Sequence, residues 1–402
     1  MVKQLREFLR LESAGGILLV IAMALAMIVV NTNLWPLYKG LLAIPLEIRI
    51  GEFEIAKPLL LWINDGLMAI FFFLIGLEVK REVLEGELSD PAQIMLPSIA
   101  AVGGVVVPAL VFTLFNYGDD AAMKAWAIPT ATDIAFALGI LSLLGKRVPA
   151  SLKLFLLTLA IIDDLVAILI IAIFYSVDIS TLSLIVAGLA YVALVVQNLR
   201  GVMRLTSYLV FGLIMWAAVL KSGVHATIAG VLLAFTIPLK HPEGKQFSPL
   251  RNLEHDLHPT VVFFILPLFA FANTGIPLDG MNMETLLQPE PFGIAMGLFI
   301  GKQLGVFTFT WAAVKTGIAK LPFKVGWLEI YGLSVLTGIG FTMSLFISSL
   351  AFEEGATNLN ADRLGILTGS IASALLGYVV LYFALRHKEP IKEDKAIEEN
   401  GA

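Results

Sequence analysis

Long runs of apolar residues, separated by short polar segments, extend along most of the 402-residue chain. Residues 15–30, for example, include no charged side chain. A helix needs about 20 mainly apolar residues to cross a bilayer, so the pattern predicts an all-α membrane protein with about twelve spans. We place these at residues 12–31, 59–83, 94–116, 121–144, 150–175, 181–199, 205–219, 223–237, 248–273, 290–315, 326–351 and 358–385.

The distribution of lysine and arginine agrees with this layout and orients it. With both termini on the cytoplasmic side, cytoplasmic segments hold 20 of the 27 basic residues and external segments hold 6. The last one, Lys302, lies within a span. Cytoplasmic loops of membrane proteins carry an excess of Lys and Arg, so we expect both termini in the cytoplasm.

The longest external loop, residues 31–58, has a local pattern of its own. Residues 46–55 alternate apolar and polar side chains around Gly51, which predicts a β-hairpin. An isolated hairpin is marginally stable in water, so it either pairs with a second subunit or lies on its own chain. We treat residues 1–387 as one transporter domain and predict that the charged residues 388–402 form a disordered cytoplasmic tail.

Composition narrows the function further. The chain is 58% hydrophobic and only 15% charged, and it contains no cysteine. Disulfides, thiol catalysis and cysteine-based metal sites are therefore excluded. No basic tract suits nucleic acid, and no phosphate-binding loop of the Gly-x4-Gly-Lys type supports a nucleotide-driven pump.

Charged residues in the middle of a span are costly and usually functional. Those in the middle of the predicted spans are Asp65, Asp133, Asp163, Asp164 and Lys302. Asp163 and Asp164 are adjacent, with apolar residues on both sides. Burial and a nearby like charge both favour the protonated form of a carboxylate, whereas the ionised form offers hard oxygen ligands to a small cation. Such a pair can hold either protons or a cation, although a structural pair balanced by a buried base is the alternative.

Two spans contain residues that interrupt a helix. Pro129, with Thr130, Thr132 and Asp133, predicts a break in the fourth span. In the eleventh span, Gly338 and Gly340 indicate either a second break or close helix packing.

Two interrupted spans seven apart in order are typical of inverted-repeat transporters. The repeats would cover residues 94–175 and 290–385. Asp133 suits the positive N-termini of the broken helices. Lys302 suits their negative C-termini, or it pairs with Asp163; it is either a structural partner or a carrier of a transported proton.

Six motifs along nearly the whole chain resemble the NhaA family of bacterial sodium/proton antiporters. They are AIIDDL at 160–165, ATDIAFALG at 131–139, GLEVKR at 76–81, KSGVHAT at 221–227, LPLFAFAN at 266–273 and GIGFTMS at 338–344.

The resemblance implies a transporter of the bacterial inner membrane that has no enzymatic activity and no cofactor. It would export Na⁺ or Li⁺ in electrogenic exchange for protons, through two discontinuous helices that cross, and so maintain internal pH and sodium. In the family, the matches to Asp163 and Asp164 bind the cation and protons, those to Thr132 and Asp133 lie at the helix crossing, and that to Lys302 faces the site. The match to Asp65 affects transport, and the hairpin resembles the family's homodimer contact.

The resemblance also implies activation by alkaline pH through charged residues on the cytoplasmic side. Here these are Glu78, Glu82, Glu254, His255 and His258. His225 matches a position linked to the pH response. Solvated helix ends for the first five, and simple packing for His225, are the alternative interpretations.

Other functional classes fit the residues less well. A sodium-coupled symporter of an organic solute could use the same broken helices, but no polar pocket for an organic substrate is evident. An intramembrane aspartyl protease needs two aspartates on separate helices, and here the main pair is adjacent on one helix. A channel would not need the carboxylate pair.

Overall fold

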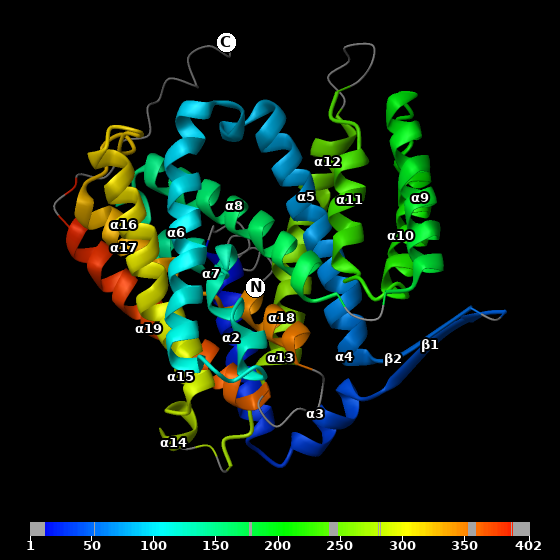
Figure 1. Cartoon of the computed structure of the whole chain (residues 1–402), viewed down its shortest axis with the longest axis horizontal. Helices are drawn as coiled ribbons and strands as arrows, with labels where there is room; N and C mark the ends of the chain where they lie inside the picture. Colours follow the sequence, from blue (N-terminus) through cyan, green and yellow to red (C-terminus); the bar gives the residue numbers. More distant parts are fainter. Residues whose placement is uncertain are drawn as a thin grey trace, which may run out of the picture.

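The computed structural model describes residues 13–51, 53–176, 179–240, 248–279, 281, 283–352, 359–386 and 388. Most described residues lie in helices, and two strands form one small sheet. The helices pack into a bundle from which the two strands project (Figure 1). The predicted helical architecture with a hairpin is therefore confirmed, whereas the predicted disordered tail lies outside the described residues except for Lys388.

Within the described residues, seven helical stretches are long and apolar enough to cross a membrane. Four are single helices: α6 (Pro91–Asn116), α8 (Ala150–Phe174), α9 (Thr181–Leu199) and α19 (Leu359–Leu385). Three contain a π-helical turn: α4 and α5 (Leu59–Leu61, Met68–Glu85) flank Trp62–Leu67, α12 and α13 (Pro249–Thr260, Leu266–Thr274) flank Val261–Ile265, and α15 and α16 (Pro289–Met296, Lys302–Lys315) flank Gly297–Gly301.

Three further stretches qualify only as bent pairs of helices. One joins the 3₁₀ turns Ala122–Ala125 and Ile128–Thr130 to α7 (Ile134–Leu143) at an angle of 40°, and another joins α17 (Trp327–Leu336) to α18 (Phe341–Ala351) at 41°. The third joins α2 (Ala14–Val30) to α3 (Trp35–Leu42) at 115°. Since α3 lies in the predicted external loop, it is a surface helix that the apolar pattern did not reveal.

Two shorter apolar helices, α10 (Leu205–Leu220) and α11 (Thr227–Thr236), occupy the predicted seventh and eighth spans. The short helix α14 (Met283–Leu286) lies in the loop before α15. The hairpin, α3 and α14 lie at one end of the bundle, opposite the α5–α6 connection (Figure 1). The charge distribution predicts that these elements lie on one side of the membrane, and in the structure they lie at one end of the bundle.

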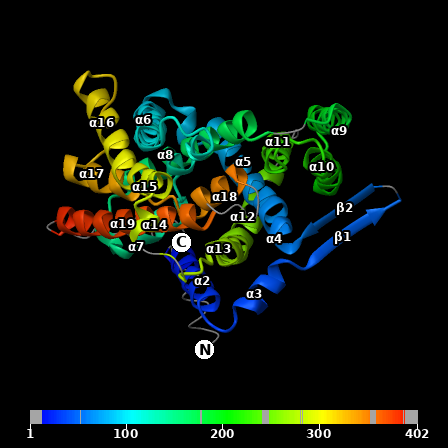
Figure 2. The same ribbon diagram turned by 60° about the horizontal axis from the view of Figure 1, so that its bottom comes forward.

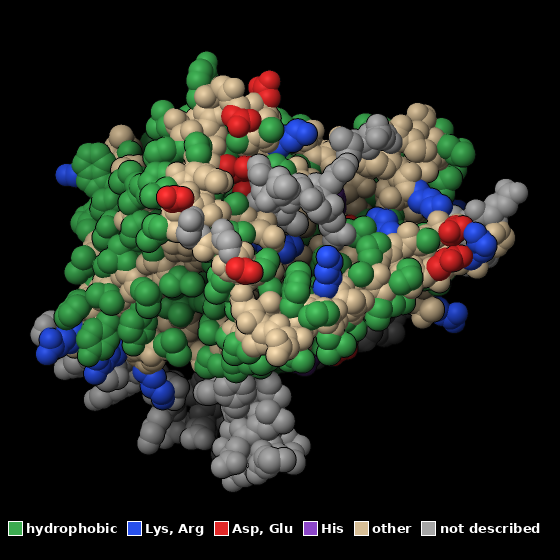
Figure 3. Space-filling model, turned by 90° about the horizontal axis from the view of Figure 1, so that it is seen from below, with side chains coloured by type: hydrophobic (Ala, Val, Ile, Leu, Met, Phe, Trp, Pro, Cys, Tyr) green, Lys and Arg blue, Asp and Glu red, His purple; other side chains and the backbone are tan. Residues whose placement is uncertain are grey.

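The outer faces of the helices are apolar. Leu114, Leu182 and Leu199 each expose more than 70% of their surface. Figure 3, seen from below, shows apolar side chains over much of this face as well, whereas several acidic and basic side chains gather near the tip of the hairpin. Exposed apolar helix faces are unfavourable in water and favourable in lipid, so this is a multi-pass membrane protein.

The hairpin forms as the alternating pattern predicted. Strands β1 (Pro45–Ile50) and β2 (Phe53–Pro58) are antiparallel, with Ile48 opposite Ile55. Gly51 has φ +64°, a conformation that favours glycine at the turn. Figure 2 shows the two strands extending away from the helices.

Close packing between α6 and α16 positions one of the charged side chains. Gly103 and Gly305 face each other so closely that a β-carbon on either would meet the other's carbonyl oxygen. Small residues allow membrane helices to approach in this way. The contact brings the Lys302 side chain next to Gly104 in the interior of the bundle.

Candidate functional site

The two adjacent aspartates lie in the middle of α8 and are buried. Asp163 is 3% exposed and Asp164 is 2% exposed. The apolar residues around them make α8 a long membrane helix, so the carboxylates are held far from either end. Helix geometry sends adjacent side chains about 100° apart, and the two carboxylates accordingly meet different neighbours.

Asp163 has a basic partner. Lys302 is completely buried, and its Nζ donates to Asp163 Oδ2 at 2.5 Å. Of the two partners left open for Lys302, the structure selects Asp163. Lys302 is the first residue after the π-helical turn Gly297–Gly301. Such turns are rare and frequent at functional sites.

Thr132 joins this pair from the interrupted fourth span. Its Oγ1 lies 2.7 Å from Asp163 Oδ2 and 2.9 Å from the carbonyl oxygen of Thr337, so one hydroxyl bridges the two. Thr337 belongs to the break between α17 and α18. The carboxylate on α8 is therefore connected to both interrupted spans.

Asp133 stabilises the N-termini of two helices. Its Oδ1 accepts from the backbone amide of Phe136, which caps α7. Its Oδ2 accepts from both the amide and the hydroxyl of Thr342, at 3.0 and 2.5 Å, in the first turn of α18. The predicted role of Asp133 at positive helix ends agrees with this geometry. Thr342 belongs to a motif quoted above, but only the folded chain reveals its contact with Asp133.

Gly338 and Gly340 combine the two roles left open by the sequence. They occupy the gap between α17 and α18, and the amide of Asp133 donates to the carbonyl of Ile339 between them at 2.6 Å. Neither has a positive φ angle. A β-carbon at Gly338 would meet the Leu298 carbonyl and Ser373, and one at Gly340 would meet Ser344. A helix break and close packing therefore occur at the same place.

Oxygen atoms suited to a small cation remain around the aspartates. Asp163 Oδ1 and Asp164 Oδ2 are buried and accept no hydrogen bond from any described residue. Na⁺ and Li⁺ are hard cations that favour oxygen ligands. With Lys302 holding the other Asp163 oxygen, the arrangement can take a cation or protons on the side of Asp164. The described residues include no cluster of three His, Cys, Asp or Glu suited to a resident metal.

Asp65 and His225 lie elsewhere in the bundle. Asp65, in the π-helical turn Trp62–Leu67, forms a 2.7 Å ion pair with Lys57 of β2. His225 packs edge-on against Phe346, with ring centroids 5.8 Å apart. Neither residue has a direct contact with Asp163, so an effect of either on transport would be indirect.

The charged residues of the predicted pH sensor form one group near the C-terminal end of α5. Arg81 is bound by Glu82 at 2.6 Å and by Glu254 of α12 at 2.9 Å, and Glu78 lies close enough to interact with all three. A 510 Å³ cavity beside them is lined by Arg81, Glu254, His255 and His258 together with Arg251 and Pro259. The structure thus brings together five residues predicted from the sequence, whereas His225 is not among the residues that line this cavity.

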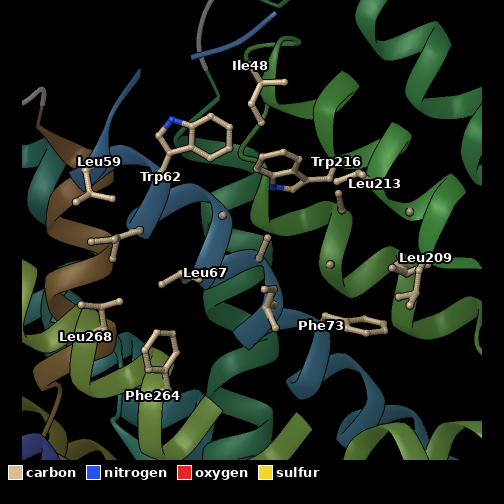
Figure 4. Close-up of a pocket in the computed structure, with 18 residues that line it drawn as sticks. Ile48, Leu59, Trp62, Leu67, Phe73, Leu209, Leu213, Trp216, Phe264 and Leu268 are labelled. Carbon is tan, nitrogen blue, oxygen red and sulfur yellow. The ribbon is translucent and has the colours of Figure 1, made fainter. Parts of the chain in front are cut away.

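A larger cavity of 660 Å³ is not a site for ions. It lies between α5, α10, α11 and α13 and is lined almost entirely by apolar side chains such as Trp62, Trp216 and Phe264 (Figure 4). A small cation needs oxygen ligands, and this lining supplies no carboxylate or hydroxyl. The candidate site therefore rests on the smaller polar cluster around Asp163.

Comparison with known proteins agrees with the motifs. A family model described as Na+/H+ antiporter 1 matches residues 6–381. The chain is 57% identical to Na(+)/H(+) antiporter NhaA 2 of Magnetococcus marinus over 389 residues, which cover 95% of this chain and 98% of the relative. It is 59% identical to Na(+)/H(+) antiporter NhaA of Pseudomonas fluorescens (96% and 98% covered) and 58% identical to Na(+)/H(+) antiporter NhaA of Shewanella baltica (96% and 100% covered). The chain therefore belongs to the Na+/H+ antiporter 1 family.

Proposed function

We propose that this protein is a Na⁺/H⁺ antiporter in which Asp163 and Asp164 bind Na⁺ and protons in alternation. It is a secondary transporter and not an enzyme. The observation that carries the site assignment is the buried ion pair between Lys302 and Asp163, with an unpaired Asp164 oxygen beside it. Buried ionisable residues in a membrane protein usually mark the path of an ion or proton.

The charges explain why Na⁺ and protons compete. With both aspartates ionised and Lys302 protonated, the cluster carries one net negative charge, which one Na⁺ or Li⁺ neutralises. Protonation of both carboxylates removes two negative charges and the ionised ligands together. Two carboxylates can take up two protons where one cation binds, so the exchange is electrogenic.

Exchange is obligatory if the unloaded, charged site cannot change sides. Moving ionised carboxylates through the membrane costs several kcal/mol, whereas the Na⁺-loaded cluster has no net charge and the protonated form has no ionised carboxylate. In the inward-facing state protons leave Asp163 and Asp164, and Na⁺ enters from the cytoplasm. In the outward-facing state Na⁺ leaves and protons return.

The architecture that would carry out this movement has twelve spans and two inverted repeats, residues 94–175 and 290–385. The interrupted fourth and eleventh spans cross at Asp133 and Gly338–Gly340. The contacts of Thr132 with Asp163 and Thr337 support this arrangement, since they join the ion site to both breaks. A rotation of either half would change the ligands around the cation.

Regulation and assembly complete the proposal. The group around Arg81, comprising Glu78, Glu82, Glu254, His255 and His258, together with His225, would activate exchange at alkaline pH. Residues 46–55 would pair with a second copy to form a homodimer. The protein would lie in the inner membrane of a bacterium, with both termini in the cytoplasm, and would maintain internal pH and sodium.

Everted membrane vesicles provide the test. Respiration acidifies their interior, and addition of Na⁺ should collapse the pH gradient when the antiporter is present. Asp163→Asn and Asp164→Asn should each abolish this response. Asp119→Asn, which changes an exposed aspartate in an external loop, should leave the response intact.

The alternative outcomes are distinct. Normal exchange in either variant at a matched protein level would disprove the site assignment. Absence of a Na⁺ response in the unmodified protein at every pH from neutral to alkaline would disprove antiport. It would favour Na⁺-coupled uptake of an organic solute.

A further inference from the structure

A second pair of buried acids lies where α15 meets α19, away from the site described above. Asp362 is 0% exposed and Glu290 is 8% exposed. Glu290 lies in the first turn of α15 and Asp362 in the first turn of α19. Both helices begin at the end of the bundle assigned to the external side. Neither residue lies mid-span, so the rule that charges in the middle of a span are functional does not apply to them.

The packing of the two helices brings these carboxyl groups together. Gly365 contacts the Pro291 carbonyl so closely that a β-carbon would collide with it. Asp362 precedes Gly365 by three residues and therefore lies on the same face of α19, while Glu290 is next to Pro291. The Asp362 and Glu290 carboxyl groups are close enough to repel each other when both are ionised.

Asp362 is not a helix cap or a hydrogen-bonded structural group. Both of its carboxylate oxygens are buried and accept no hydrogen bond from any described residue. An acid in the first turn of a helix is favourably placed near the positive helix end, but a buried carboxyl group without partners is expensive. The geometry therefore requires another source of stabilisation.

The charged groups that act on Asp362 are the acidic Glu290 and the basic Arg363. Glu284 of the neighbouring α14 is acidic as well, and it is exposed. With both acids ionised, Glu290, Asp362 and Arg363 carry one net negative charge. On the other side of the α15 turn, Asn116 Nδ2 donates to the Pro289 carbonyl at 3.2 Å, and Asn116 Oδ1 is also buried without a partner.

We propose that Glu290 and Asp362 form a second site for one small cation, a proton or Na⁺, at the external end of the α15–α19 contact. The ligands would be carboxylate oxygens, which suit either ion. A single bound cation neutralises the cluster and removes the repulsion that would otherwise separate the two helices. The site is at the start of the span that carries Lys302, about 18 Å from it along the helix. This inference goes beyond the proposed function and does not depend on it.

The test measures binding in the absence of the transport site. In purified protein carrying Asp163→Asn and Asp164→Asn, we would measure binding of radioactive ²²Na⁺ and the infrared band of protonated carboxyl groups between pH 6 and 9. Each is then repeated after adding Asp362→Asn. Asp279→Asn serves as the matched control, since it changes an exposed external aspartate. Glu290→Gln replaces Asp362→Asn if the latter elutes as an aggregate.

The measurements distinguish the two cations. If the site holds Na⁺, residual ²²Na⁺ binding should weaken at least tenfold with Asp362→Asn and remain with Asp279→Asn. If it holds a proton, one protonated-carboxyl band should disappear with Asp362→Asn alone. If neither Asp362→Asn nor Glu290→Gln changes either signal relative to Asp279→Asn, the proposal is overturned. Because the readout is binding at Asp362, failure of the Asp163–Asp164 assignment would show separately as unchanged Na⁺ binding in the starting variant.

Discussion

Replacing Asp133 by alanine should destabilise the protein more than any exposed aspartate does. The Asp133 carboxylate accepts one hydrogen bond from the amide of Phe136 and two from Thr342. Alanine leaves three donors at the starts of α7 and α18 without a partner. Phe136 and Thr342 are buried, so water does not take the place of the lost carboxylate. The two helix N-termini also lose the negative charge that stabilises their dipoles.

The size of the effect follows from these contacts. A hydrogen bond to a charged group contributes about 1.5–3 kcal/mol, and neighbouring contributions do not add fully. We therefore expect a loss of about 5 kcal/mol for Asp133→Ala. At about 2 °C per kcal/mol for a large domain, the melting temperature should fall by roughly 10 °C. The melting temperature of Asp133→Asn should lie between those of the unmodified protein and Asp133→Ala. The asparagine oxygen still accepts one hydrogen bond, whereas its nitrogen faces the Thr342 donors.

The assay is thermal denaturation of purified protein in detergent. The readout is the fraction of protein that remains monodisperse after heating. Asp119→Ala is the matched control, since Asp119 also accepts from two backbone amides, those of Ala121 and Ala122, but in an exposed turn. Water replaces those bonds, so its melting temperature should change little. If Asp133→Ala melts within 2 °C of Asp119→Ala (about 1 kcal/mol), the proposed role of Asp133 at two helix ends is refuted.

Two further predictions test the contacts around the candidate ion site and the packing that positions it. Thr132→Val removes the hydroxyl bound to Asp163 and should raise the apparent KM for Na⁺ about fivefold, as expected for about 1 kcal/mol. Thr132→Ser keeps a hydroxyl and should leave the KM unchanged. An unchanged KM in vesicles for the valine variant would contradict the contact. Gly103→Ala should lower the melting temperature because its β-carbon meets the Gly305 carbonyl, at a cost of about 1–3 kcal/mol. Gly188→Ala is the control, since a β-carbon at Gly188 faces open space. Equal melting temperatures of the two variants would show that the Gly103–Gly305 contact is loose.

The spans and their interruptions could be predicted from the sequence because both depend on neighbouring residues. An apolar run long enough to cross a bilayer is a local property. Pro129 indicates a break for a local reason, and it lies in a 3₁₀ turn before the gap at residues 131–133. Gly51 likewise marks the turn of the hairpin. The surface helix α3 was missed because eight residues beside a longer apolar helix give no separate signal.

The partners within the site could not be predicted from local pattern. Lys302 is 139 positions from Asp163 in sequence, and two pairings for it were compatible with the residues alone. The double contact of Thr342 with Asp133 also joins distant segments. Asp362 went unnoticed because its burial comes from α15, which packs over the end of a helix that would otherwise be solvated. In each case tertiary contacts decide what a charged side chain does.

The contacts around Asp133 also explain how a small ion could control a large movement. The Thr132 hydroxyl of one interrupted span contacts the Asp163 carboxylate, and the same hydroxyl contacts the carbonyl oxygen of Thr337 in the other. Asp133 then binds both spans again through Ile339 and Thr342. A cation that draws the Asp163 carboxylate toward itself must weaken the Thr132 contact or move both helix breaks with it. Since packed helices shift between discrete arrangements instead of deforming gradually, a small displacement of the carboxylate can be amplified into a change from one arrangement to the other.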